Sequence, residues 1–191
     1  NDKTKDSVFT VLFKDKENVL KLYQDLMPED ADVTIDEIEI QTLESVLAHT
    51  IYNDLGFIVR DKFIILVEAQ SKWNRNMSLR MAFYLFETYR RYLAETKQSE
   101  HYSVKVKIPK PCLYVIYTGD DKSDIPETIS LSEDYFDGDS SFAEIKAKVI
   151  HKGDSSTMYG QYICFCKVFN EQYSIHKNSL KCAKETVRLC I

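Results

Sequence analysis

The chain has 191 residues, 44% of them hydrophobic and 12% aromatic, which is enough to fill the core of one domain of ordinary size. With only 5 glycines and 4 prolines, and with 29% charged residues, the composition excludes a turn-dense β-sandwich or a low-complexity linker and indicates a compact α/β or α+β domain. The net charge of -5 argues against nucleic-acid binding unless the basic residues cluster. They do: residues 72–110 hold nine basic and three acidic side chains, a local +6, whereas residues 111–144 hold nine acidic and one basic, a local -8.

No stretch reaches the roughly 18 apolar residues of a membrane-spanning helix, and the N-terminal residues lack the pattern of a signal peptide. We therefore expect a cytoplasmic protein that does not bind a membrane. The five cysteines are scattered and lack zinc-finger spacing, which fits a reducing compartment and a role as small core residues. They are Cys112, Cys164, Cys166, Cys182 and Cys190.

The N-terminal third combines one helical pattern with one unclear segment. Residues 7–27 place apolar side chains at helical spacing, interrupted near Asp15 and ended before Pro28. This pattern predicts two short helices or one bent helix. Residues 30–43 are too acidic and irregular to assign, and we expect them to form a connector.

The central part of the chain predicts a β-hairpin, a helix and a further strand. Residues 51–59 and 63–70 are apolar and β-branched, and the three polar residues between them are short enough for an antiparallel hairpin. From Met77 to Tyr92, apolar residues on one side predict a helix of about four turns that packs on the hairpin. Residues 107–119 predict a buried strand of the same sheet.

The C-terminal part predicts a loop, a strand and two helices. Residues 120–136 are expected to form a polar surface loop, and the alternation in residues 142–151 predicts an edge strand with one polar face. The last forty residues have the spacing of two helices. Because no repeat or linker divides the chain, we expect residues 1–191 to form a single domain. The absence of a C-cap signal near Ile191 suggests that the last helix is truncated.

Two acidic residues of the hairpin are candidates for a metal site. If Asp61 is the midpoint of the turn, paired residue numbers sum to 122, and Asp54 lies directly across from Glu68. A turn shifted by one residue would spoil this exact pairing, but we expect the two acids still to be close enough to share an ion. Two such carboxylates repel each other unless a cation lies between them, and carboxylate oxygens with water are the ligands that Mg²⁺ accepts. Gln70 shares a strand face with Glu68, and its amide can orient a water molecule or a phosphate without acting as a base.

The alternative is that Asp54 and Glu68 are ordinary acids at strand ends in solvent. Glu68 ends an apolar run that begins at Phe63. Burying a carboxylate in such a run is costly unless a cation or hydrogen bonds compensate its charge, and this context favours the metal site.

The segment after the hairpin carries the candidates for nucleic-acid binding. It holds three basic residues and the single tryptophan of the chain: Lys72, Trp73, Arg75 and Arg80. Such residues hold the phosphate backbone or stack on a base. Asn76, Arg80 and Tyr84 recur at every fourth position and predict a polar stripe on the following helix. For Arg80, DNA binding and a structural role are equally open: in the structural role Arg80 pairs with Glu68 or caps the sheet.

Several segments resemble the PD-(D/E)XK nuclease family transposases, also called recombination-promoting nucleases. They are KDSVFTVLF, NDLGFIVRDKFIILVEAQSKWNRNMSLRMAFYLF, IPKPCLYVIYTGD and ISLSEDYF, and they span most of the chain. The resemblance implies a restriction-endonuclease-like fold, a mixed β-sheet flanked by helices, in an enzyme that cuts DNA with Mg²⁺ or Mn²⁺. It assigns Asp54 and Glu68 to the metal, and these two with Gln70 to catalysis. Asn53 stands where the motif has proline, and Gln70 where it has lysine.

Three functions follow from these observations, in order of preference. The first is a Mg²⁺-dependent DNA endonuclease of low sequence specificity, a hydrolase of phosphodiester bonds linked to mobile elements or recombination. The second is a binding or regulatory module with the nuclease fold but weak or no catalysis, which the net charge of -5 and Gln70 favour. The third is a structural domain whose C-terminal helix mediates homo-oligomers.

Overall fold

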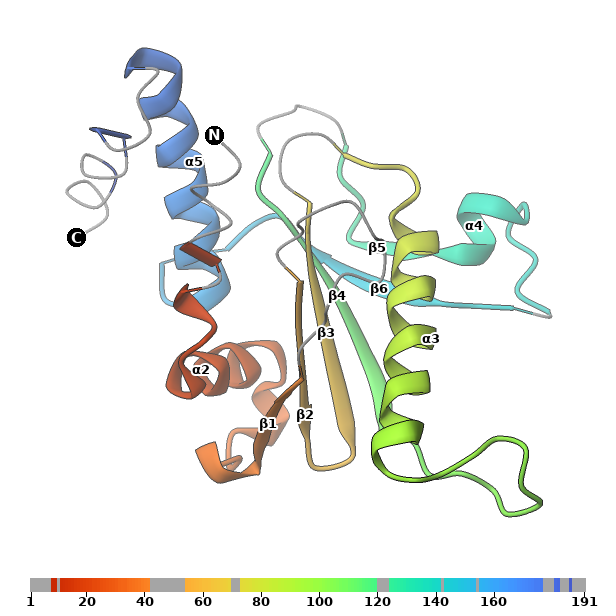
Figure 1. Cartoon of the computed structure of the whole chain (residues 1–191). Helices are drawn as coiled ribbons and strands as arrows, with labels where there is room; N and C mark the ends of the chain where they lie inside the picture. The colour runs from red at the N-terminus through yellow and green to blue at the C-terminus, as the bar shows by residue number, and fades with distance from the viewer. Residues whose placement is uncertain are drawn as a thin grey trace.

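A computed structural model of the chain describes residues 8–9, 11–41, 54–69, 73–119, 124–141, 143–153, 155–176, 181–182 and 186, with the backbone alone for residues 41, 54, 66–69 and 176. Six strands form one mixed open sheet in the order β1-β2-β3-β4-β6-β5 (Figure 1). The strands are β1 (Ile38–Gln41), β2 (Asp54–Val59), β3 (Lys62–Ala69), β4 (Lys110–Tyr117), β5 (Thr128–Ser130) and β6 (Lys146–Ile150). The α-helices of the described residues are α2 (Lys16–Leu26), α3 (Met77–Glu95), α4 (Leu131–Tyr135) and α5 (Met158–His176). The expected α/β class is confirmed.

The strand directions divide the sheet into an antiparallel and a parallel part. β1, β2 and β3 form an antiparallel meander, whereas β4 runs parallel to β3 and β6 runs parallel to β4. Parallel neighbours need a long crossover, and α3 supplies it between β3 and β4. Strand β5 returns antiparallel to β6 and closes the row. The predicted hairpin, helix and further strand are all confirmed.

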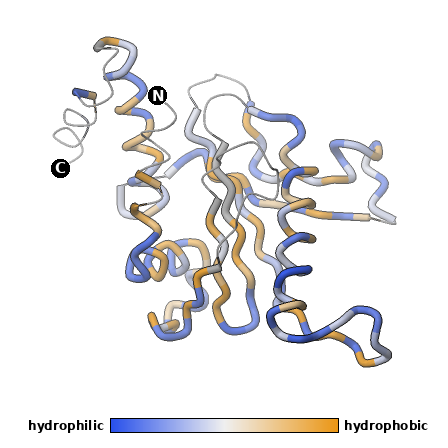
Figure 2. Tube along the Cα trace, in the orientation of Figure 1, coloured by the Kyte–Doolittle hydropathy of each residue, from blue (hydrophilic) through white to orange (hydrophobic). Residues whose placement is uncertain are grey.

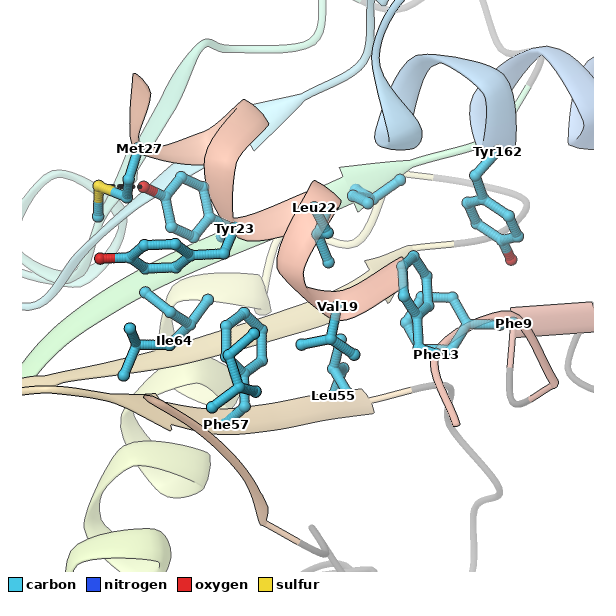
Figure 3. Packing of buried hydrophobic residues seen from close by; sticks show 14 of the residues in the cluster. Phe9, Phe13, Val19, Leu22, Tyr23, Met27, Leu55, Phe57, Ile64 and Tyr162 are labelled. Carbon is cyan, nitrogen blue, oxygen red and sulfur yellow. Dashed lines mark hydrogen bonds between the residues drawn. The ribbon is translucent and has the colours of Figure 1, made fainter. Parts of the chain in front are cut away.

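Helices cover both faces of the sheet, and each face has its own core. On one face, residues of α2 and α5 pack on Phe57, Ile64 and Tyr114 (Figure 3). On the other, α3 packs Met81 and Tyr84 against residues of β3, β4 and β6. Because both faces are buried, the central strands are apolar between their charged ends, and Figure 2 shows hydrophobic stretches ending at a hydrophilic hairpin turn.

The interruption predicted near Asp15 is the start of α2. The Asp15 carboxylate accepts a hydrogen bond from the backbone N–H of Glu17 at 2.9 Å and so caps the helix, which ends just before Pro28. Before this cap, Phe9 and Phe13 pack edge to face, with ring centroids 4.7 Å apart. The ring of Phe9 also packs edge to face on Tyr162 of α5, with ring centroids 5.4 Å apart. The first segment therefore belongs to the core that α5 covers (Figure 3).

The connector expected over residues 30–43 is wrong in its central part. It contains the short 3-10 helix η2 (Ile35–Glu37) and the edge strand β1, while residues 42–43 lie outside the described part of the chain. Ile38 is buried beside exposed Glu39, and this alternation becomes a strand because β2 provides a partner.

Two expectations for the acidic region are also wrong. The polar loop expected over residues 120–136 contains β5 and α4, because Ile129 and Leu131 are buried against the sheet. The alternating strand β6 is present, but it lies between β4 and β5, so β5 is the edge. Alternation showed that one side of β6 is polar, but it does not show which strands pair with it.

At the C-terminus, α5 accounts for the first of the two expected helices. Of the second, only residues 181–182 and 186 are described, and they are helical. The expectation of core cysteines is correct for buried Cys166 and Cys182 and wrong for exposed Cys164; Cys112 is half-buried, and these four thiols are free. Cys190 lies outside the described residues. Among the described helices, none combines the length and apolar character that a membrane crossing requires.

Charged groups fix the turn of the hairpin. Arg60 adopts φ 54° in the turn and donates from Nε to Glu37 at 2.8 Å, which lowers the pKa of Glu37 to about 2. Beside it, Lys62 pairs with Asp30, and the Tyr23 hydroxyl donates to Asp30 at 2.6 Å. Burial, together with the Asp30 hydrogen bond, raises the pKa of Tyr23 to about 12. These contacts hold the register of the hairpin at one end.

Candidate functional site

The opposite end of the sheet collects the sequence-predicted site residues. There β2 begins at Asp54 and β3 ends at Ala69, which pairs with Tyr117, the last residue of β4. Helix α3 begins at the same end with Met77, and β5 begins there with Thr128 (Figure 1). Because β3 and β4 are parallel, their carboxyl ends meet at this edge, which is where ligands bind in many α/β proteins.

The hairpin register corrects one prediction about this end. Arg60 and Asp61 alone form the loop, so paired residue numbers sum to 121, and Asp54 lies opposite Val67. The direct pairing of Asp54 with Glu68 is therefore wrong by one residue. The reason is the turn, which has two residues where the sequence argument placed a single midpoint.

The one-residue shift in the hairpin register affects whether Asp54 and Glu68 can bind the same metal ion. Their carboxylate oxygens are suitable ligands for Mg²⁺ or Mn²⁺, and the backbone brings Asp54 and Glu68 to adjacent strands. In a regular ladder, however, residues one position out of register project from opposite faces. A shared ion therefore requires the strands to depart from regular pairing at this end. Among the side chains that the structure describes, no three His, Cys, Asp or Glu form a metal-binding group.

The predicted DNA-binding residues fall in different environments. Gln70 of the catalytic set and Lys72 lie outside the described residues. Trp73 is half-buried against the core under α3, and its ring meets Tyr117 edge to face, with centroids 5.9 Å apart. Arg75 is exposed. The structure thus fixes Trp73 at the end of β4 and leaves Arg75 open to solvent.

A glycine allows the ring of Tyr117 to lie where Trp73 contacts it. A Cβ atom added to Gly119 would lie 2.4 Å from the Tyr117 hydroxyl oxygen, closer than real Cβ atoms approach. Any larger residue at this position would displace the ring. Gly119 is therefore part of the support of Trp73.

Arg80 lies inside the fold and not on a polar stripe. Its guanidinium is 5.9 Å from the ring centroid of Tyr84, and Arg80 is half-buried. Tyr84 itself is only 3% exposed and belongs to the core, so the stripe predicted through Asn76, Arg80 and Tyr84 is wrong. Asn76 accepts a hydrogen bond from the Tyr135 hydroxyl at 2.7 Å and ties α3 to α4. These contacts favour a structural role for Arg80.

A pocket of about 840 Å³ opens beside Trp73. It lies between the start of α3, strand β5 and helix α4. Its walls are Trp73, Asn74, Arg75, Met77, Asp124, Pro126, Thr128, Ile129, Ser130, Glu133 and Asp134. The described wall residues include one cation, Arg75, and three carboxylates, so the pocket is neither purely apolar nor purely basic.

Sequence reasoning missed the acidic wall of this pocket because residues 120–136 were expected to be a loop. One signal was available: Ser130 stands three positions before Glu133, the spacing of a helix-capping pair. In the structure Ser130 is indeed the N-cap of α4, accepting from the backbone N–H of Glu133. Only the fold, however, brings this helix next to Trp73.

A half-buried carboxylate anchors α4. Glu144 accepts hydrogen bonds from the Ser132 hydroxyl at 2.6 Å and from the Ser130 hydroxyl at 2.9 Å. The Ser132 hydrogen bond is the main cause that lowers the pKa of Glu144 to about 2. Both serines are buried, so the ionised carboxylate holds the start of α4 in place.

A Glu144→Gln variant is expected to lose stability in a pH-dependent way. The pKa of Glu144 in the fold, about 2, lies below its ordinary value of 4.5, so the unfolded chain binds the proton more readily. The stabilisation is complete above about pH 4.5 and is lost as the pH falls toward 2. Thermal unfolding from pH 2.5 to 7 should show a Tm deficit of the variant that is largest at neutral pH and closes in acid. A deficit that is constant with pH contradicts this role, and exposed Glu95→Gln is the control.

Comparisons with protein-family models, with curated proteins and with solved structures give no significant match to this chain.

Proposed function

We propose that this protein is a metal-dependent DNA endonuclease with a restriction-endonuclease-like fold. The observation that carries the proposal is that Asp54 and Glu68 lie on adjacent strands at the end of the sheet where β3 and β4 terminate. The order of elements supports the finer fold: an antiparallel meander, a crossover helix and a parallel strand follow one another. The proposed link to mobile elements or recombination rests on the sequence resemblance.

In this proposal the chain's own residues bind, orient and position the substrate. Asp54 and Glu68 hold the divalent ion, and the amide of Gln70 orients the attacking water or the phosphate. The ion, when bound, lowers the pKa of a water molecule and offsets charge on the phosphoryl oxygens. Arg75, exposed near the same end, contacts the DNA phosphates, as Lys72 would from its position in the sequence.

Cleavage of supercoiled plasmid tests this proposal directly. We expect nicked circles in the presence of Mg²⁺ or Mn²⁺ and none with excess chelator, since the ion supplies the activated water. Restoring the metal after chelation should restore nicking. Intact plasmid under all metal conditions, or nicking that chelator does not reduce, would refute the nuclease function.

One observation favours a second candidate, a binding module with the nuclease fold and little or no catalysis. The register places Asp54 opposite Val67 and not opposite Glu68, and Gln70 replaces the basic residue of the motif. Retention of labelled DNA without any cleavage would distinguish this function from the first. In that outcome, substitution of Asp54 or Glu68 should leave retention unchanged.

A further inference from the structure

The pocket beside Trp73 is not required by the hydrolysis itself, and its chemistry points to a ligand. Trp73 contributes the only indole of the chain, held against Tyr117 at a centroid distance of 5.9 Å. Arg75 contributes a cation, and Asp124, together with two acids of α4, contributes three carboxylates. A ligand for this space must offer a flat apolar surface and hydrogen-bond donors together.

The charges of the pocket disfavour the backbone of a DNA duplex. Among the described wall residues, one cation stands against three carboxylates, a net charge of -2, whereas duplex binding depends on neutralising many phosphates. The carboxylates of Asp124 and Asp134 form no ion pair with any residue that the structure describes. Both residues are exposed, so their carboxylates can exchange water for hydrogen-bond donors of a ligand, and phosphate oxygens offer no donors.

An unpaired nucleobase fits this combination. The volume of about 840 Å³ lies in the range of small-molecule sites. A base can stack on or pack against an indole, and Asp accepts hydrogen bonds from the exocyclic amino group that cytosine, adenine and guanine carry. Arg75, at the exposed rim, can hold the phosphate that follows such a base.

We propose that the pocket holds an unpaired base with an exocyclic amino group (cytosine, adenine or guanine), so that single-stranded or locally unpaired DNA is the preferred substrate. This inference rests on the proposed function for its choice of nucleic acid. The pocket lies at the end of the sheet that also carries Asp54 and Glu68, so a base in it would set the strand beside those residues. Duplex DNA would have to expose a base first, which costs a few kcal/mol.

Fluorescence of the single tryptophan measures occupation of the pocket. The full chain is titrated, in chelator to prevent cleavage, with ten-nucleotide oligomers of deoxycytidine and of deoxyuridine. Their bases have the same size but differ at C4, an amino group in cytosine and a carbonyl in uracil, and at N3, which carries a hydrogen only in uracil. We expect the deoxycytidine oligomer to change the Trp73 emission and to bind about tenfold more tightly than the deoxyuridine oligomer. A duplex of equal length should bind more weakly than the deoxycytidine oligomer.

A pair of variants tests whether the carboxylates read the base. In the double variant Asp124→Asn and Asp134→Asn, the preference for deoxycytidine should fall to about twofold or less, because an amide offers a weaker and less specific acceptor. The double variant Glu95→Gln and Glu100→Gln removes the same charge at two exposed positions, one at the far end of α3 and one beyond it, and should keep the preference. Equal binding of the two oligomers by the wild type, or an unchanged preference in the pocket variant, overturns the inference.

The outcome is separable from that of the proposed function. If the chain never nicks plasmid but prefers the deoxycytidine oligomer, the base-binding pocket is supported and the nuclease function is refuted. If the chain nicks plasmid but binds both oligomers and duplex equally, the nuclease function is supported and the base-binding pocket is refuted.

Discussion

Glu68→Gln and Asp54→Asn are each expected to reduce metal-dependent nicking by at least about 10³-fold. Both changes keep the shape of the side chain and remove the charge that holds the ion, and a bound metal contributes several kcal/mol to such reactions, where each 1.36 kcal/mol is tenfold in rate. Initial nicking rates of supercoiled plasmid at saturating Mg²⁺ measure the effect. Thermal unfolding of each variant, compared with the wild type, excludes loss of the fold as the cause.

Asp61→Asn is the matched control for these variants. Asp61 is an exposed acid of the same hairpin, but it lies in the turn at the opposite end of the strands. Its substitution should leave the nicking rate within about twofold of the wild type, because surface changes away from a site have small effects. Equal rates for wild type, Asp54→Asn and Glu68→Gln would place the chemistry elsewhere.

Phe57→Ala is expected to destabilise the fold by about 3–5 kcal/mol, the usual cost of removing a buried phenylalanine. Phe57 is fully buried in the centre of β2, pairs with Ile64 of β3, and meets the ring of Tyr23 at 6.3 Å between centroids (Figure 3). Alanine would leave a cavity between α2 and the sheet. For a chain of this size the loss corresponds to a Tm about 6–20 °C lower.

Phe86→Ala removes the same side chain at a position 62% exposed on α3. It should change the stability by no more than about 0.5 kcal/mol. Denaturant unfolding of both variants measures the contrast. If the two substitutions cost the same, the layer between α2 and the sheet is not packed as the structure describes.

Local pattern was sufficient where a segment carries its own signal. The hairpin, α3 and β4 follow from runs of apolar residues whose period and length are typical of one kind of element. The break at Asp15 is equally local, because a capping carboxylate and a following proline mark both ends of α2. Segments with weak patterns failed: β1 and β5 are short, and a strand of three or four residues forms only where a neighbour supplies its hydrogen bonds.

For the candidate site, too, the sequence predicted some features and not others. The identity of Asp54, Glu68 and Trp73 as candidates came from their positions in and after an apolar hairpin. Their relative placement depended on one turn residue, since a loop of two residues in place of a single midpoint moved Asp54 from Glu68 to Val67. The acidic wall of the pocket could not be predicted from the sequence. Asp134 lies about sixty residues from Trp73 in the chain, and the two line the same pocket only because β5 pairs with β6.

The sequence by itself determined the α/β class, the three central elements and which end of the hairpin carries the acids. These properties depend on the periodicity of apolar residues and on their order along the chain, and both can be read from short segments of the sequence. Only the tertiary structure decided the edge strands, the hairpin register and the wall that faces Trp73 across the pocket. They depend on which distant segments pair, and pairing is selected by the burial of both faces of the whole sheet.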